Sequence, residues 1–342
     1  MRSATLLVSV FACGCTAAPG TSPDAAVPPD SLLITPDAPP GTHCTAMAPR
    51  SVAPTVFVAP TGYQQRMLDT INNAKTSLDI QMYLFTTNKL ESAVIAAKNR
   101  GVAVRVLLDK DEAGNDSTRT SLQNAGVMTK DDPATFPFAH AKYVIADHAS
   151  VTIMSANWND GAMTEERNYG MVDRDPDDLA DAQTIFDADW AGTSPSLPCT
   201  RLIVSPVNAK PRVLDLINGA QTSLDVEALY VSDATIQNAI IAAAGRGVAV
   251  RVILSDPSST PDNTSTAALF GGKGIPTRVI TTFDIHAKLI VADKARALIG
   301  SQNFSLTSLT KNREVGAIVF EPGALTAVNT QYDSDWAIAT TP

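Results

Sequence analysis

The sequence lacks a surplus of basic residues. Its 342 residues include 26 Lys and Arg against 35 Asp and Glu, which gives a net charge of −9 at pH 7. Residues 51–196 hold twenty acidic and twelve basic residues, whereas residues 197–342 hold twelve of each. A protein that grips long nucleic acid through its phosphates needs a basic surface. The composition therefore disfavours nucleic acid as a partner.

The sequence also has no apolar run long enough to span a bilayer. The apolar segment at 4–12 follows one basic residue and is too short to cross. Since cysteines follow it at once, we interpret residues 1–15 as a bacterial secretory signal with a lipidation site at Cys13 or Cys15, or as an ordinary cleaved signal. Residues 16–48 are rich in Pro, Ala, Ser, Thr and Asp and are expected to form a disordered tether. The sequence thus predicts an exported protein, either secreted or held as an outer-membrane lipoprotein at the membrane surface of the bacterial cell envelope.

Cysteines and metal-ligand clusters are scarce as well. If Cys13 and Cys15 belong to the leader, Cys44 and Cys199 remain, and an exported protein would pair them. We therefore predict a disulfide between Cys44 and Cys199. No cluster of carboxylates or of Cys and His residues has the spacing of a metal site, so we expect neither a metal nor another cofactor.

What the sequence does contain is an internal repeat with an offset of 146 residues. The segment HAKYVIAD begins at His140 and HAKLIVAD at His286. The same offset, without insertion or deletion, aligns AKTSLD with AQTSLD, two copies of RGVAVRV, and Trp190 with Trp336. A repeat of this length is the size of a small domain. We predict two lobes of one fold, residues 49–196 and 197–342, which form an internal pseudo-dimer in a monomeric protein.

Hydrophobic periodicity gives both lobes the same order of elements. In the first lobe we expect strands at 55–59, 78–85, 102–108, 151–155 and 169–173 and at the motif, helices at 64–74 and 89–100, a helix and short strand within 117–128, and a closing helix near Trp190. The alternation predicts an α/β fold in which helices cover both faces of a mixed, mostly parallel sheet.

The repeated motif carries reactive side chains at fixed spacing. In both copies a histidine and a lysine two positions later precede an aspartate, a serine and an asparagine. This pattern resembles the His-x-Lys-x4-Asp signature of the phospholipase D superfamily, including its downstream Gly-Ser-x-Asn segment, over residues 55–336. The first copy departs at Met154, where glycine is usual, and at Asn168, where the second copy has Glu314. The matching residues are His140, Lys142, Asp147, Ser155 and Asn157 in the first copy, and His286, Lys288, Asp293, Ser301 and Asn303 in the second.

The resemblance implies that the lobes pack as a pseudo-twofold dimer around one site for a phosphodiester. An anionic phosphodiester resists anionic attack, so a neutral imidazole is a suitable nucleophile once a second imidazolium protonates the leaving oxygen. Lys142 and Lys288 would supply cationic donors, and Asn157 and Asn303 neutral ones, for the oxygens whose charge grows in the transition state. This chemistry requires no metal.

The resemblance also implies that each histidine is supported from the other lobe. Glu314 would orient His140, and Asn168 would orient His286. A carboxylate stabilises a phosphohistidine and the imidazolium that precedes it, whereas a neutral amide leaves a proton that is surrendered more readily. We therefore assign His140 as the nucleophile and His286 as the general acid.

The remaining motif residues are given structural or binding roles. Asp147 and Asp293 lie at an odd offset from their lysines, so they should point away from the catalytic face and bond backbone at the strand end; Ser155 and Ser301 are assigned to the same structural motif. Trp158 is expected to be a partly exposed wall of the substrate groove, and Phe304 a second wall or a core residue. Arg167 and Arg313 are expected to brace the interface between the lobes.

These residues predict a phospholipase D-like phosphodiesterase. Phospholipid is our first choice of substrate, cleaved by hydrolysis or transferred to an alcohol. A nonspecific nuclease is the alternative, because the segments before His140 and His286 are too short for large lids. A binding module without turnover is the rival from another class. A cardiolipin-synthase-like transferase usually carries transmembrane helices, which are not seen in this sequence.

Overall fold

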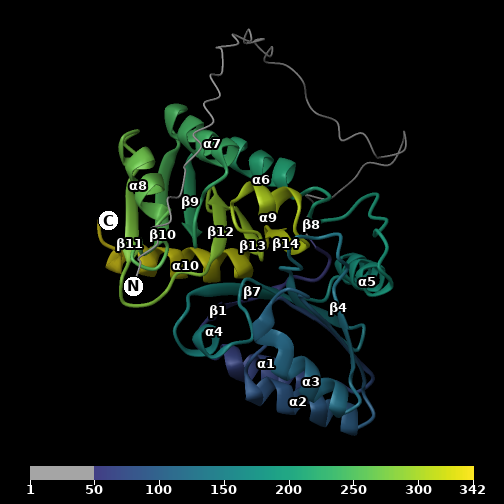
Figure 1. Cartoon of the computed structure of the whole chain (residues 1–342). Coiled ribbons are helices and arrows are strands. Elements are labelled where there is room, and N and C mark those ends of the chain that lie inside the picture. Colours follow the sequence, from purple (N-terminus) through teal and green to yellow (C-terminus); the bar gives the residue numbers. More distant parts are fainter. Residues whose placement is uncertain (1–49) are drawn as a thin grey trace, which may run out of the picture. The chain divides into compact units, whose positions relative to one another are not determined.

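The computed structural model describes residues 50–342. The predicted signal, the lipidation site at Cys13 or Cys15, the tether and Cys44 lie outside the described residues. The described residues belong to one compact unit that contains two copies of one α/β lobe (Figure 1).

The first lobe carries seven strands and five α-helices in the described range, with one short 3-10 helix. Its elements are β1 (Thr55–Ala59), α1 (Tyr63–Asn73), β2 (Ser77–Met82), α2 (Asn88–Asn99), β3 (Ala103–Leu108), η1 (Ala113–Asn115), α3 (Asp116–Asn124), β4 (Met128–Asp131), β5 (Lys142–Ala146), β6 (Ser150–Met154), α4 (Asp160–Thr164), β7 (Asn168–Asp173) and α5 (Pro176–Ala191).

The second lobe repeats this order without the 3-10 helix. Its elements are β8 (Leu202–Ser205), α6 (Ala209–Asn218), β9 (Ser223–Ala228), α7 (Ala234–Gly245), β10 (Ala249–Ser255), α8 (Asn263–Gly271), β11 (Thr277–Ile280), β12 (Lys288–Ala292), β13 (Arg296–Gly300), α9 (Leu306–Thr310), β14 (Glu314–Val319) and α10 (Pro322–Ile338). The short helix α4 lies between the predicted strands at 151–155 and 169–173, where the sequence predicted no helix, and α9 is its counterpart.

Each lobe contains one seven-stranded mixed sheet. The strand orders are β1-β7-β6-β5-β2-β3-β4 and β8-β14-β13-β12-β9-β10-β11. The mixed α/β fold was predicted correctly, but the expectation of mostly parallel pairing was wrong. Only β2, β3 and β4, with their counterparts β9, β10 and β11, pair in parallel; the other four pairings of each sheet are antiparallel. Helical crossovers permit parallel neighbours, whereas the tight turn between β5 and β6 forces an antiparallel pair.

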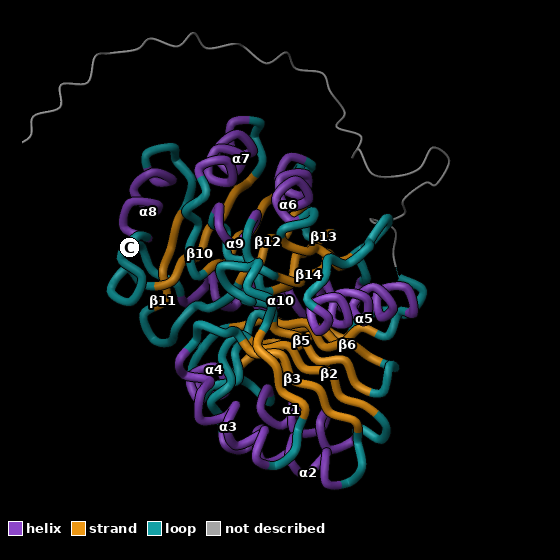
Figure 2. The backbone as a smooth tube through the Cα atoms, turned by 45° about the vertical axis from the view of Figure 1, so that its right-hand side comes forward, coloured by secondary structure: helices purple, strands orange, loops and turns teal. Residues whose placement is uncertain are grey.

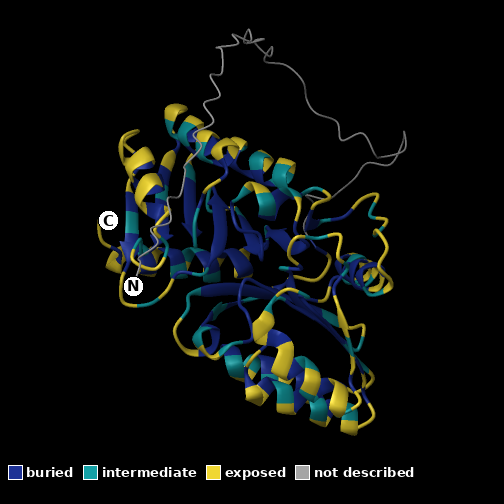
Figure 3. Ribbon diagram, in the orientation of Figure 1, coloured by how far each residue is buried: buried dark blue, intermediate teal, exposed yellow. Residues whose placement is uncertain are grey.

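The two sheets share a core between them. On the outer face of each sheet, α1–α3 and α6–α8 cover separate apolar clusters, and Figure 2 shows these helices on the outside of the strands. On the inner face, β5–β7 contact β12–β14, and α5 and α10 complete one apolar cluster to which both lobes contribute. Figure 3 shows the strands buried and the outer helices exposed on one side. The second face of each sheet is thus covered largely by the other lobe.

Reciprocal ion pairs brace the interface, as predicted for Arg167 and Arg313. Arg167 Nε donates to Asp335 Oδ2 at 2.7 Å, and Arg313 Nη2 donates to Asp189 Oδ1 at 2.9 Å. Each arginine belongs to one lobe and its aspartate to the closing helix of the other. These pairs are buried or nearly so, so that loss of one partner would leave an uncompensated charge in the interface.

Cys199 is disulfide-bonded, as predicted for this residue. Its predicted partner, Cys44, lies outside the described residues.

The departure of the first motif at Met154 has a local compensation. In the second lobe a Cβ on Gly300 would lie 2.4 Å from Oε1 of Gln302, whose buried side chain donates to the carbonyl of Ile203 at 2.8 Å. The first lobe has Ala156 at the position of Gln302. The smaller side chain leaves room for Met154, whose sulfur accepts from the Tyr63 hydroxyl at 3.1 Å. Met154 therefore repacks the lobe interior and leaves the motif strand in place.

Candidate active site

Short bridges between the lobes bring the two histidines to the interface. His140 lies just before β5 and His286 just before β12. Ala139 pairs with Arg313 of the other lobe, and Ile285 with Arg167. The His286 amide donates to the Arg167 carbonyl at 3.0 Å. Each histidine therefore lies at the start of its own motif strand and against the edge of the opposite lobe.

His140 is held by Glu314 across this interface. Nδ1 of His140 lies 3.0 Å from both carboxylate oxygens of Glu314, as the resemblance implied. The carboxylate is fully buried and also accepts from Ser301 Oγ and Ser308 Oγ, each at 2.6 Å, and from Asn312 Nδ2 at 3.2 Å. Burial raises the pKa of Glu314, but the charge and hydrogen bond of His140, the charge of Lys142 and the hydrogen bond from Ser301 outweigh it and lower the pKa below its ordinary value.

This arrangement fixes the tautomer of His140. An ionised carboxylate only accepts, so Nδ1 must carry a proton and Nε2 keeps its lone pair in the neutral ring. The side chain is 12% exposed, which leaves Nε2 as the nitrogen available to a substrate. The geometry suits a nucleophile.

His286 has a neutral partner, as the resemblance also implied. Nδ1 of His286 lies 2.9 Å from Oδ1 of Asn168. Asn168 Oδ1 accepts from Ser155 Oγ at 2.8 Å, while its Nδ2 donates to Glu166 Oε2 at 3.2 Å. These partners set the orientation of the amide, which therefore accepts from Nδ1 of His286.

Glu166 is a site residue that the sequence analysis missed. Its Oε2 lies 3.7 Å from Nδ1 of His286, beyond direct hydrogen bonding but close enough to act as a charge. With the offset of 146 residues, Glu166 aligns with Asn312 and Asn168 with Glu314. The two lobes thus carry the same carboxylate and amide in exchanged positions, and the amide contacts the carboxylate in both. A comparison of the repeats at 166 and 312 as well as at 168 and 314 would have found Glu166.

The two lysines lie buried beneath the histidines. Lys142 Nζ donates to the carbonyl of His140, and Lys288 Nζ to the carbonyl of His286, each at 2.6 Å. Burial lowers the pKa of Lys142 to about 7, against the opposing charge of Glu314. Burial likewise lowers the pKa of Lys288 well below its ordinary value, and Lys142 adds to this shift. The negative charge of a phosphodiester would favour the ammonium form of both.

The charges of the two motifs act on one another, so the motifs share one site. Burial lowers the pKa of His140; Glu314 opposes this shift, and Lys142 and the opposite lobe's Lys288 add to it. Burial lowers the pKa of His286 well below its ordinary value, and Lys288 adds to this shift. Lys142 and His140 of the first lobe lower the pKa of His286 further. The contacts of Glu314 with His140 and of Asn168 with His286 place the two motifs on either side of the same interface.

Asn157 and Asn303 are nearly buried and only partly satisfied. They are 7% and 8% exposed, and the Oδ1 atom of each has no hydrogen-bond partner in the described structure. Unsatisfied buried polar atoms are rare in folded proteins. The carbonyl oxygen of each amide is thus without a hydrogen-bond partner in the described structure. The role of the two side chains as donors to substrate stays a prediction.

Trp158 does not line a groove, so the prediction of a substrate-binding role for it was wrong, whereas Phe304 takes the second of its two predicted roles, that of a core residue. Both are fully buried. Trp158 packs edge-on against Phe85 with ring centroids 4.7 Å apart, within the outer core of the first lobe. Phe304 lies in the corresponding core of the second lobe. The aromatic ring that does reach the site is Tyr83, whose centroid lies 4.7 Å from that of His140.

Asp147 and Asp293 have the structural role predicted for them. Asp147 Oδ1 accepts from the amides of Thr76 at 2.6 Å and Ser77 at 3.0 Å, and both carboxylate oxygens accept from the Lys75 amide. Asp147 and the next residue have φ of 55° and 49°, which a type I′ turn between β5 and β6 requires. Asp293 repeats the arrangement. The aspartate ties the hairpin turn to the start of the neighbouring strand.

We expect Asp147→Asn to lower the free energy of unfolding by about 1–2 kcal/mol at pH 7, because the amide keeps the turn but weakens charge-assisted hydrogen bonds. Burial raises the pKa of Asp147, but the backbone amides lower it to about 2. The stabilisation is therefore full above about pH 4 and lost as the pH falls through about 2. Urea unfolding at pH 7 and pH 2.5 should show the difference from the native chain shrinking at the lower pH. Asp215→Asn, at an exposed position, is the control; an equal loss there would contradict the prediction.

Within residues 50–342, no three side chains of His, Cys, Asp or Glu converge as a metal ligand set. None of the helices in this range is both long and apolar enough to cross a membrane.

The sequence profile described as "Cardiolipin synthase, PLD-like domain" matches residues 67–190 and, separately, residues 213–336. The chain belongs to this family. Each matched segment contains one His-x-Lys motif, so the resemblance to the phospholipase D superfamily is confirmed in both repeats.

Curated relatives match part of the chain. A "Mitochondrial cardiolipin hydrolase" of Chlamydomonas reinhardtii is 31% identical over 128 residues, which are 36% of this chain and 56% of the relative. "Phospholipase D Y" of Dictyostelium discoideum is 29% identical over 145 residues, covering 36% of this chain and 33% of the relative. The chain therefore spans about half or less of the length of these relatives.

Solved structures share the fold. The chain superposes on a phosphatidylserine synthase from Haemophilus influenzae Rd KW20 with a TM-score of 0.69 at 14% identity, covering 86% of this chain and 88% of the other. A polyphosphate kinase from Porphyromonas gingivalis gives a TM-score of 0.65 at 15% identity, covering 83% and 47%. At these identities the likeness concerns the fold alone.

Proposed function

We propose that the protein is a phosphodiesterase that cleaves phospholipid through a phosphohistidine. Nε2 of His140 attacks phosphorus, and the protonated His286 gives its Nε2 proton to the leaving oxygen. The neutral His286 then takes a proton from water, which attacks the phosphohistidine and frees His140. Atoms and charge balance without a metal. The single observation that carries the proposal is the pair of histidines held at Nδ1 from opposite lobes, one by Glu314 and one by Asn168.

The unequal partners support the division of roles. The carboxylate of Glu314 lies beside the ring of His140, and its negative charge favours the cationic ring formed on phosphorylation. His286 receives only the amide oxygen of Asn168, with the charge of Glu166 farther away. Burial lowers the pKa of both rings, and Glu314 opposes this shift at His140. The negative charge of a bound phosphodiester would favour the imidazolium form of His286, which then gives its proton readily to the leaving oxygen. An alcohol in place of water would give transfer in the second step.

An apolar rim favours lipid over nucleic acid. We define this rim as Phe138 and Leu306, which are 43% and 53% exposed. Phe138 packs on Tyr83, the ring that contacts His140, and Leu306 begins α9 shortly after Asn303. The residues aligned with Phe138 and Leu306 are Asp284 and Asp160. These positions are thus apolar in one copy of the repeat and acidic in the other, a difference that suits a substrate with an acyl part and a headgroup.

We expect Phe138→Ser/Leu306→Ser to lower the hydrolysis of phosphatidylglycerol vesicles about tenfold or more, because burial of each side chain in lipid contributes about 1.5–3 kcal/mol when complete. Cleavage of soluble bis(p-nitrophenyl) phosphate should change less than about twofold. The assay is run with EDTA, alongside plasmid degradation at increasing salt. Rapid plasmid cleavage that falls with salt, with vesicles left intact, would identify a nuclease instead.

We also propose that the protein is exported. The disulfide at Cys199 supports this, since disulfides persist in oxidising compartments. Membrane anchoring through Cys13 or Cys15 remains part of the proposal, and labelling with radioactive palmitate in a bacterial host tests it.

A further inference from the structure

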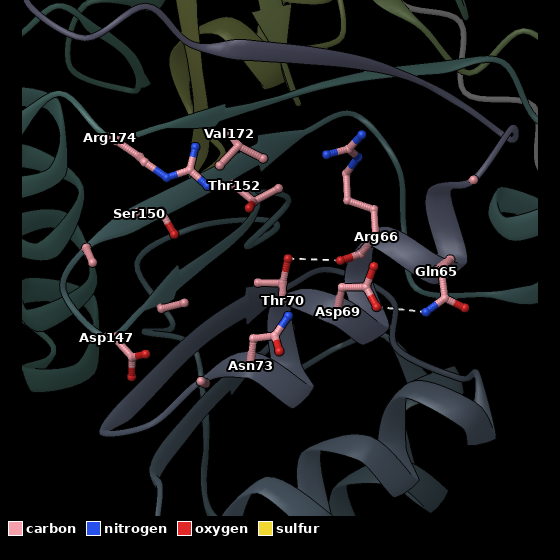
Figure 4. A pocket seen from close by; sticks show the side chains of 14 residues that line it. Gln65, Arg66, Asp69, Thr70, Asn73, Asp147, Ser150, Thr152, Val172 and Arg174 are labelled. Atoms are coloured by element: carbon pink, nitrogen blue, oxygen red, sulfur yellow. Dashed lines mark hydrogen bonds between the residues drawn. The ribbon is translucent and has the colours of Figure 1, made fainter.

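A second pocket lies in the first lobe, away from the histidines. It has a volume of about 520 Å³ and lies between α1 and the ends of β5, β6 and β7 (Figure 4). Asp147 lines it at the end of β5 opposite to His140. Seven residues of extended chain separate these two by on the order of 20 Å. The pocket is therefore separate from the catalytic site.

Two arginines in this pocket have uncommitted guanidinium groups. Arg66 stacks at 5.0 Å over the ring of Phe57, but neither Arg66 nor Arg174 has a side-chain hydrogen bond or ion pair within residues 50–342. All twelve other arginines of this range hold a carboxylate or a backbone carbonyl. Two guanidinium groups without an acidic partner in one pocket offer a binding site for a ligand of opposite charge.

Arg66 lies on α1 and Arg174 just after β7, and both line the pocket. In the view of Figure 4, Thr152 and Val172 lie between the side chains of Arg66 and Arg174. Thr152 is only 1% exposed, so its hydroxyl lies at the base of the pocket. The acidic residues that line the pocket have other partners: Asp147 accepts backbone amides, and Asp69 accepts from Gln65 Nε2 at 2.8 Å. Neither aspartate forms an ion pair with Arg66 or Arg174 in the described structure.

The positions that line this pocket have counterparts in the second lobe, where they serve packing alone. Its Arg212 is not free, because Nη1 donates to the carbonyls of Thr200 and Leu202 at 3.0 and 2.9 Å. The first lobe carries polar side chains where the second carries apolar ones: Thr70 for Leu216, Thr152 for Leu298, and Arg174 for Phe320. Leu216 and Leu298 are fully buried in the outer core of their lobe. The polar lining therefore is not needed for the fold.

We propose that this pocket binds a phosphate-bearing anion, with the phosphate between Arg66 and Arg174 and the hydroxyl of Thr152 beneath it. Guanidinium groups bind phosphate oxygens in a bidentate fork, which a lone lysine cannot reproduce. The ligand is either a soluble phosphate ester or the headgroup of an anionic phospholipid. The site does not take part in the reaction proposed above, and the proposal of an anion site is independent of that reaction.

The test uses the full chain carrying His140→Ala, so that no probe is consumed. Arg66→Gln/Arg174→Gln removes both charges, and Lys98→Gln/Lys273→Gln is a control with the same change of net charge outside the pocket. Thr152→Leu/Arg174→Phe gives the first lobe the residues of the second and fills the pocket while keeping Arg66. The probes are sn-glycerol 3-phosphate in calorimetry, and co-sedimentation with vesicles of phosphatidylglycerol and phosphatidylcholine against phosphatidylcholine alone.

Both pocket variants should weaken binding at least about tenfold, with the control unchanged. Loss of one glycerol phosphate site identifies a soluble ester, and loss of phosphatidylglycerol binding alone identifies a lipid headgroup. Unchanged binding of both probes by the pocket variants overturns the proposal. An equal loss in the lysine control also overturns it, because binding then follows net charge and not the pocket. Thermal melting confirms that each variant is folded.

Discussion

Replacing His140 by alanine is expected to lower phosphodiester turnover by at least about 10⁴-fold, since losses of this size follow removal of a nucleophile or its base in other covalent mechanisms. The site offers no substitute: Lys142 points its ammonium at the carbonyl of His140, and Glu314 is enclosed by its donors. His286→Ala should lower turnover of an alkyl phosphodiester to a similar extent, because the poor leaving group needs a proton. Steady-state rates with phospholipid in mixed micelles give both values.

An activated substrate separates the two roles. A p-nitrophenyl leaving group departs without protonation, so His286→Ala should release one equivalent of nitrophenol in a burst and then stall before hydrolysis. The phosphoryl adduct should be found by mass spectrometry on the peptide that contains His140. His140→Ala should give neither burst nor adduct. An adduct on His286 in that variant would reverse our assignment.

The exposed His148, which contacts Gln183 at 2.8 Å, provides the control. His148→Ala should retain full activity. Unchanged melting temperatures for the variants at His140 and His286 would exclude loss of folding as the cause.

Glu314→Gln is expected to lower kcat by about 10²–10⁴-fold, although it replaces only one oxygen by nitrogen. The amide can donate to Nδ1 of His140 and thereby favour the wrong tautomer, an effect of about 10⁴ in a catalytic triad. It also carries two hydrogens into a pocket where Ser301, Ser308 and Asn312 all donate, so some stability should be lost as well. The rate of adduct formation on His140 and the melting temperature measure the two effects separately.

Glu166→Gln is the matched comparison, because Glu166 is the same residue in the exchanged position of the other lobe. It acts on His286 from 3.7 Å and through Asn168, so we expect a loss of only about 3–30-fold. Its negative charge favours the imidazolium, and its removal should lower the pKa of His286 further. The alkaline limb of the kcat/KM profile should then move to lower pH. Equal losses for Glu166→Gln and Glu314→Gln, with no shift of that limb, would contradict the asymmetry.

The duplicated motif made much of this site predictable. The same spacing joins His140 to Lys142 and His286 to Lys288, in two halves of equal length. A duplicated fold places equivalent loops at the interface between its copies. The contacts of Glu314 and Asn168 across that interface followed from the family resemblance. The roles of Asp147 and Asp293 followed from strand alternation, because an odd offset turns a side chain to the opposite face.

Other features depend on packing that no local pattern encodes. Trp158 was expected at a groove, but its burial is decided by Phe85, which comes from a distant loop of the same lobe. The parallel or antiparallel sense of the sheet depends on which strands become neighbours, and β1 pairs with β7, the last strand of its lobe. Tyr83 reaches His140, yet its counterpart is Leu229, so the repeat gave no signal there.

The common apolar layer between the sheets has a consequence for how the two halves could diverge. In a symmetric homodimer every substitution is made twice, and an acid and a base at the shared centre must be the same residue in the same surroundings. A single polypeptide removes that constraint. Glu166 and Asn168 could exchange places relative to Asn312 and Glu314, and one outer face could lose its leucines to threonine, while the partner half kept the sheets closed. Covalent joining thus allows the two lobes to carry different residues and to take different roles at the shared site.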